Sequence, residues 1–200
     1  MDAYQNLVEK LHELPSQPAV LRRLQSLISQ EEVSSHQAAE IIEMDQGFTV
    51  RILRLVNSPF YGFSRMVVSV EEAITMLGFN AVHQLLLTSS LMKSMDWQGK
   101  AVNLHAFWKH SFGVGVAAKH LLYGMDKHIM DEAFICGIVH DVGRLVYIKT
   151  DFKKYAAFHA GPKRATSLNE EREFFGADHQ VLGQLLAGKW NFPESVRTVI

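Results

Sequence analysis

One apolar run constrains this chain more than any other feature of its sequence. The residues from Ala133 to Tyr147 read AFICGIVHDVGRLVY and leave no polar face. An element without a polar face belongs in the middle of a fold. The run is long for a strand, and Asp131 with Glu132 suits an N-cap and an acidic first turn, so we predict a buried helix. Its β-branched content leaves a buried strand as the alternative.

Charged residues stand inside this run, where burial makes them costly. His140 and Asp141 are adjacent, and Arg144 follows one turn later. An unpaired buried carboxylate is unfavourable, so Asp141 needs a cation, a metal or several donors. Neighbouring helical positions are about 100° apart, so both His140 and Asp141 can reach a metal beside the helix. In the alternative, the pair is structural and Arg144 or backbone donors satisfy the carboxylate.

Two further histidines extend the candidate site. His110 and His179 fall on other predicted helices and would close the site from across the bundle. Imidazole and carboxylate together suit divalent iron, manganese or zinc. The candidate ligands of a single metal are therefore His110, His140, Asp141 and His179. A metal held this way lowers the pKa of bound water and can act on a phosphate ester.

Other site chemistries have no support in the sequence. Cys136 is the only cysteine, which excludes an intrachain disulfide and a cysteine-rich zinc site. On the central helix it is expected to be an inert small hydrophobe. The chain has neither a glycine-rich phosphate loop nor a Ser-His-Asp signature, so we assign no other cofactor.

Helical periodicity runs through the rest of the chain, with no two-residue hairpin signal and no alternating strand. Ser167 with Glu170 forms a capping box, and Asp45 and Asp178 suit N-caps. We predict an all-α chain of roughly ten helices joined by short loops. Besides the central run, the expected helices begin near residues 16, 34, 45, 69, 80, 103, 151, 167, 178 and 193.

Composition indicates a globular chain, because 48% of the residues are apolar and 20% are charged. The net charge of −1 implies no general attraction to nucleic acid or to anionic lipid. The N-terminus carries no apolar signal core, and no run is long enough to span a bilayer. We therefore expect a cytoplasmic protein that binds neither membrane nor nucleic acid.

An aromatic loop follows the helix that Asn57-Ser58-Pro59 ends. It carries Phe60, Tyr61 and Phe63 around Gly62. If these rings are exposed, they mark a partner site. In the other interpretation they fill the seam between the two halves of the chain.

The quoted motifs carry a family resemblance. His110 lies in FWKHS, His140 and Asp141 in GIVHDVGRL, and His179 in GADHQVLGQLLAGKWNFPESV. These segments resemble the HD superfamily and, more closely, its HDOD branch, the HD-related output domain of bacterial signalling proteins. The first half agrees, with LPSQPAVLRRLQSLI, AAEIIEMDQGFTVRILRLVNSPFYG and VSVEEAITMLGFNAVHQLLL. The resemblance covers about residues 14–200.

The resemblance implies two packed helical bundles, of which the C-terminal one is HD-like. We expect an N-terminal subdomain over residues 1–100 and an HD-like subdomain over residues 101–200. The implied role is that of a non-enzymatic signalling or protein-interaction module, whose partner is a protein of a signalling pathway.

Departures from the catalytic members bear on activity. Catalytic HD phosphohydrolases end their ligand set with an Asp on a late helix, and no acid after Asp141 stands in a matching context. The diesterase branch with a GYP motif has Lys where this chain has Arg144. The candidate ligands are therefore too few for a two-metal hydrolase site, but they could still hold one metal. The alternative function is a metal-dependent phosphohydrolase acting on a nucleotide or cyclic dinucleotide.

Overall fold

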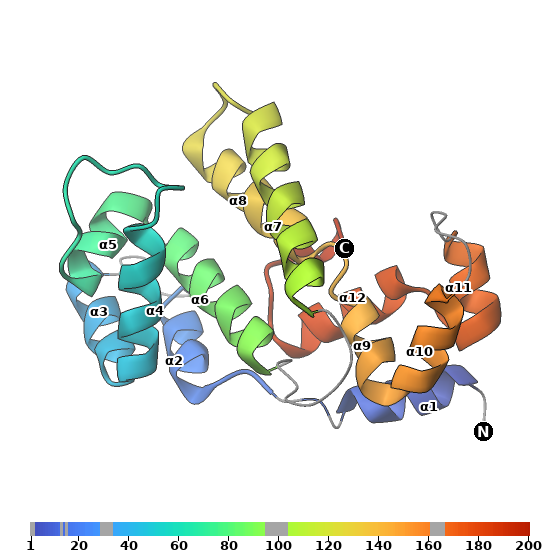
Figure 1. The fold of residues 1–200 in the computed structure, drawn as a ribbon. Coiled ribbons are helices and arrows are strands. Elements are labelled where there is room, and N and C mark those ends of the chain that lie inside the picture. The colour runs from blue at the N-terminus through green and yellow to red at the C-terminus, as the bar shows by residue number, and fades with distance from the viewer. Residues whose placement is uncertain (1–2, 13, 15, 29–33, 95–103, 161–166) are drawn as a thin grey trace. The chain divides into compact units, whose positions relative to one another are not determined.

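The computed structural model describes residues 3–12, 14, 16–28, 34–94, 104–160 and 167–200, and these contain helices and no strand. The all-α prediction is thereby confirmed (Figure 1). The chain forms two compact units. The smaller unit is Gln17–Asp96, and the larger unit combines Met1–Ser16 with Trp97–Ile200. The expected subdomains met near residue 100, whereas the compact units group the first sixteen residues with the second half.

The smaller unit is a helical bundle around an apolar core. Leu21, Leu24, Ile42, Ile52 and Leu86 are fully enclosed in it. Asp45 begins α4 as expected, because its carboxylate accepts hydrogen bonds from the backbone N–H groups of Gly47 and Phe48. The helices of this unit are α2 (Ala19–Ile28), α3 (Ser35–Glu43), α4 (Gln46–Val56), α5 (Val70–Leu77) and α6 (Phe79–Ser94).

The larger unit contains the remaining helices. A long antiparallel hairpin of α7 and α8 forms one part of it, and α9 packs against α1, α10 and α12 (Figure 1). The helices are α1 (Ala3–His12), α7 (Leu104–Leu121), α8 (Lys127–Val139), α9 (Arg144–Thr150), α10 (Phe152–His159), α11 (Leu168–Phe175), α12 (His179–Lys189) and α13 (Glu194–Arg197).

The central apolar run is two helices, so the prediction of one continuous helix was wrong. α8 begins after its N-cap Asp126 rather than at Asp131, and it ends at Val139. Residues 140–143 form a tight turn before α9. In this turn the N–H groups of Val142 and Arg144 bond to carbonyls three residues earlier. An all-apolar pattern indicates that a segment is buried, but it does not indicate where the backbone changes direction.

Burial follows the prediction for Asp141 and Cys136 but not for His140. Asp141 and Cys136 are buried, with 6% and 8% of their surface exposed. His140 keeps 28% of its side chain exposed, so the expectation that it is nearly buried was wrong. The turn directs its imidazole toward the surface, whereas Asp141 faces inward.

The N-terminal helix α1 was not predicted. Leu7 and Leu11 are buried on one face of α1, and Leu14 is buried just after the helix. Lys189 of α12 holds the end of this segment. Its Nζ donates hydrogen bonds to the carbonyls of Leu11, His12 and Leu14, at 3.0, 2.7 and 2.6 Å. The opening residues of the chain therefore belong to the core of the larger unit.

The aromatic loop is held at its base by Asn57. The Asn57 amide donates to the carbonyl of Val67 and accepts from its N–H, both at 2.8 Å. Phe60, Tyr61 and Phe63 are half-buried, and the last two rings stack with centroids 6.0 Å apart. The packing of this loop against the other half of the chain stays a prediction. Within the described residues, every helix is too short or too polar to cross a membrane.

Candidate metal centre

The turn after α8 positions His140 and Asp141. The Nδ1 atom of His140 lies 2.7 Å from the Gly137 carbonyl, and a hydrogen bond there leaves Nε2 facing the Asp141 carboxylate at 3.4 Å. Gly143 permits the turn to approach α12. A Cβ on Gly143 would lie 1.8 Å from the His179 carbonyl oxygen and 2.6 Å from the Gly183 nitrogen. The glycine of HDVG is therefore required by close packing beside the site.

The register of the α7–α8 hairpin brings in His110. Gly115 and Gly137 meet where the helices are nearest, because a Cβ on Gly137 would lie 2.5 Å from the Gly115 Cα. His110 lies five residues before Gly115 and His140 three residues after Gly137, so the antiparallel hairpin brings both histidines to the same side of this contact. Their ring centroids are 5.4 Å apart, and the His110 side chain is 59% exposed.

His179 enters from the first turn of α12. Asp178 caps this helix by accepting from the Val181 N–H at 2.9 Å. The capping fixes the direction of the residue that follows, and His179 points its Nε2 at Asp141 Oδ1, 3.5 Å away. The predicted N-cap, Asp178, and the predicted ligand, His179, are thus adjacent residues with different roles.

Three of the predicted ligands, all histidines, converge on the carboxylate of the fourth, Asp141. Oδ2 faces His140 Nε2 at 3.4 Å and His110 Nε2 at 3.9 Å. Oδ1 faces His179 Nε2 at 3.5 Å and Arg144 Nε at 3.2 Å, although the arginine N–H is not aligned for a hydrogen bond. His110, His140 and Asp141 offer atoms that all lie within 4.8 Å of one another, and His179 is not part of that group.

Sequence reasoning missed Glu171, which is 1% exposed on α11. Its Oε2 lies 2.6 Å from His179 Nδ1 and accepts the His179 backbone N–H at 2.9 Å. Its Oε1 lies 3.8 Å from Arg144 Nη2. One signal was present in the sequence, because Leu168, Glu171 and Phe175 share a helical face, so the acid sits in an apolar stripe.

The charges of the cluster compensate one another. Burial acts to raise the pKa of Asp141, but contacts with His140 and Arg144 outweigh it and hold that pKa below its ordinary value. The contact with Asp141 raises the pKa of His140, although burial acts in the opposite direction. The carboxylate therefore stays ionised at neutral pH and attracts either protonated imidazoles or a cation.

The donor set fits a single divalent metal. His140 and His179 each use Nδ1 for a hydrogen bond, to the Gly137 carbonyl and to Glu171. A neutral imidazole that donates from Nδ1 carries its lone pair on Nε2. In both residues this Nε2 faces the buried carboxylate. His110, His140 and Asp141 would hold the ion, and His179, the fourth predicted ligand, would join them from the side of the other carboxylate oxygen. Such an ion would act as a Lewis acid and lower the pKa of bound water.

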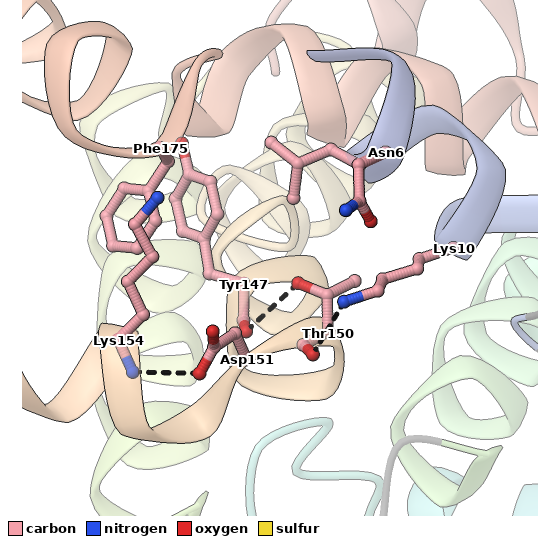
Figure 2. A pocket seen from close by; sticks show the side chains of 8 residues that line it. Asn6, Lys10, Tyr147, Thr150, Asp151, Lys154 and Phe175 are labelled. Atoms are coloured by element: carbon pink, nitrogen blue, oxygen red, sulfur yellow. Dashed lines mark hydrogen bonds between the residues drawn. The ribbon is translucent and has the colours of Figure 1, made fainter. Parts of the chain in front are cut away.

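The described residues of the larger unit line hollows beside and away from the histidine cluster. One of about 510 Å³ opens on α7 beside His110 and is lined by Ala106, Lys109, His110, Gly113, Val114 and Ala117. Another of about 100 Å³ lies among α1, α9, α10 and α11 (Figure 2). There Lys10 Nζ donates to the Thr150 carbonyl, and the Lys154 N–H donates to Asp151. These groups already serve the helix ends, so we assign the second hollow no ligand.

The sequence profile of the HDOD domain matches residues 14–200. The chain belongs to the HDOD domain family. An uncharacterised protein from Treponema pallidum (strain Nichols) is 23% identical to this HDOD chain over 208 residues, which cover 98% of the chain. The chain spans 38% of that relative's length.

Solved structures share this HDOD fold. A candidate phosphohydrolase from Shewanella amazonensis SB2B is 27% identical with a TM-score of 0.75, and the match covers 97% of this chain and 70% of that one. An HDOD domain protein of unknown function from Geobacter sulfurreducens is 23% identical with a TM-score of 0.71. That match covers 98% of this chain and 69% of the other, and it concerns the fold.

Proposed function

We propose that this HDOD domain is a non-enzymatic output module that acts in signalling by binding a protein partner. The observation that carries the proposal is the engagement of both acids of the histidine cluster, Asp141 and Glu171. Arg144 and His179 face one oxygen of Asp141, and histidines 110 and 140 face the other. Glu171 is committed to His179 and Arg144. Neither carboxylate is free to bridge to a second metal ion. A two-metal phosphohydrolase needs both ions, because together they stabilise the attacking and the leaving oxygen.

Exposed apolar side chains at the α7–α8 turn support the binding role. Leu121 and Tyr123 are 86% and 82% exposed, and Met125 and Ile129 are also exposed. Contiguous apolar side chains on a surface mark interaction sites, and aromatic residues and methionine are enriched in protein interfaces. We therefore place the partner contact at residues 121–129.

A metal-dependent phosphohydrolase is the second candidate. The metal-spaced group of His110, His140 and Asp141 favours it, as does the similarity to the candidate phosphohydrolase from Shewanella amazonensis SB2B. A single ion could still polarise a phosphate ester, and the hollow beside His110 could admit one. This function would act on a nucleotide or cyclic dinucleotide.

A hydrolysis assay separates the two candidates. Purified protein would be loaded with manganese, iron or zinc and offered a nitrophenyl phosphodiester, a nucleoside monophosphate and a cyclic dinucleotide. We expect turnover no higher than that of the Asp141→Asn variant. Metal-dependent turnover that Asp141→Asn abolishes, in a variant with an unchanged thermal midpoint, would make the enzyme assignment correct.

The partner contact needs its own comparison. Tagged wild-type protein, Asp141→Asn and a Leu121→Ser/Tyr123→Ser variant would be used to capture proteins from lysates of the source organism. We expect one partner retained by the wild type and Asp141→Asn but lost from the surface variant. Equal capture by all three would place the contact elsewhere, and loss with Asp141→Asn alone would tie binding to the histidine cluster.

A further inference from the structure

We infer that Glu171 is a positioning residue that sets how tightly the histidine cluster holds a divalent metal. It acts through His179, which it holds with Nδ1 as the hydrogen-bond donor and Nε2 turned toward Asp141. The inference rests on the capacity of the cluster to bind a metal and is independent of whether the domain hydrolyses phosphate or binds a partner.

The contacts of Glu171 are directed at His179 from two sides. One oxygen, Oε2, lies 2.6 Å from the ring Nδ1 and 2.9 Å from the backbone N–H of the same residue. Two bonds from one oxygen to one residue fix both the backbone and the ring. The imidazole therefore cannot rotate away from Asp141 without losing a buried bond.

Glu171 is placed to orient a ligand and not to be one. Its Oε2 also lies 3.5 Å from the Tyr147 hydroxyl, and its Oε1 lies 3.8 Å from Arg144 Nη2. The Tyr147 hydroxyl in turn donates to the Ala177 carbonyl at 2.5 Å, which holds the segment between α11 and α12. Both oxygens thus face donors of the protein, with 1% of the residue exposed.

The chemical consequence concerns the His179 tautomer. A neutral imidazole carries one N–H and one lone pair. A carboxylate at Nδ1 requires the proton there, so the lone pair lies on Nε2, the atom 3.5 Å from Asp141 Oδ1. A carboxylate behind a ligating histidine also raises its basicity, and loss of such a partner costs 10–100-fold in metal affinity.

Metal titration tests the inference without any activity readout. Cobalt(II) or zinc(II) would be titrated against a chromophoric chelator, with the cobalt absorption bands as a signature of the ligand set. We expect Glu171→Gln to weaken binding about 10–100-fold and to change the cobalt spectrum. The matched control is Glu173→Gln, the same charge change at an exposed position of α11, which should bind like the wild type.

A double variant shows whether Glu171 acts through His179. Glu171→Gln combined with His179→Ala should bind metal no more weakly than His179→Ala alone, because the positioned ring is already gone. Fully additive losses would overturn the inference. So would unchanged affinity in Glu171→Gln, or wild-type protein that binds neither metal, and neither result would bear on partner binding.

A measurement on the wild-type protein tests the inference even if the variants fail to fold. Long-range proton–nitrogen NMR of the zinc-loaded protein should show His179 with a slowly exchanging proton on Nδ1 and the metal-shifted signal on Nε2. A proton on Nε2, or a zinc-shifted Nδ1, would overturn the assignment whatever the stability of Glu171→Gln.

Discussion

His83 lies in the middle of α6 with 2% of its surface exposed, and its ring stacks on Phe79 with centroids 6.2 Å apart. Burial lowers its pKa to about 4, against the opposing effect of a hydrogen bond to the Leu21 backbone. Asp141 is also buried, yet its pKa falls because its contacts with His140 and Arg144 outweigh the effect of burial. Burial disfavours the charged form of both residues, and the partners that each one finds decide which form prevails.

The first prediction concerns acid stability. Between pH about 6.5 and about 4, His83 is protonated in the unfolded state but not in the folded state. The free energy of unfolding therefore falls as the pH drops through this window. The loss amounts to about 3 kcal/mol, since each pKa unit is worth about 1.4 kcal/mol. Urea denaturation at pH 7, 6 and 5 should show a smaller acid loss for His83→Leu than for the wild type.

The two proteins are compared by how much the free energy of unfolding changes with pH, and not by its value at one pH. His83→Leu leaves the Leu21 backbone without its partner, which lowers stability by an amount that does not depend on pH. Parallel stability profiles for the two proteins would show that His83 accepts a proton in the folded state.

Among the elements, the α7–α8 hairpin depends on how closely its helices approach. A Cβ on Gly137 would lie 2.5 Å from Gly115 Cα and 2.6 Å from its nitrogen, both of them backbone atoms. Backbone cannot move aside as a flexible side chain can. The contact also sets the register that places His110 beside His140, so the packing of the hairpin and the geometry of the site share one cause.

The second prediction is a pair of glycine substitutions in this hairpin. Gly137→Ala should destabilise the protein by about 1–3 kcal/mol, because overpacking against backbone exceeds the gain in helix propensity. Gly113→Ala, on the open side of α7 where a Cβ would meet nothing within 4 Å, should stabilise by about 0.5–1 kcal/mol. Chemical denaturation measures both, and destabilisation by both substitutions to the same extent would refute the close-approach argument.

For the molecule as a whole, α1 joins the beginning of the chain to its end. Lys189 Nζ donates to three main-chain carbonyls at the end of α1 and just after it, and one of them, that of Leu11, also accepts the Leu14 N–H. These bonds span more than 170 positions of the sequence. The first sixteen residues are thus held in the larger unit both by the buried leucines and by one ammonium group.

The third prediction tests this tie. Lys189→Met keeps most of the side-chain volume but removes the charged donor, and it should lower the free energy of unfolding by about 1.5–3 kcal/mol. Amide hydrogen exchange in α1 should accelerate with it. Lys153→Met, the same change at an exposed position of α10, serves as the control and should leave both quantities within about 0.5 kcal/mol of the wild type.

Much of the local structure follows from near neighbours in the sequence. The capping box of Ser167 with Glu170 and the caps at Asp45 and Asp178 form as predicted. Where no such neighbours act, prediction fails. The break after Val139 carries no local signal because both sides of it are apolar.

Periodicity and capping were enough to predict the helical fold class, and motifs specific to the HDOD family were enough to name the candidate ligands. The contact of Glu171 with His179, the close approaches at Gly143 and Gly137, and the place of α1 in the larger unit became visible in the folded structure. The reason is physical. Capping and periodicity depend on residues within a turn or two, whereas these contacts join segments whose approach is set by the packing of the whole unit.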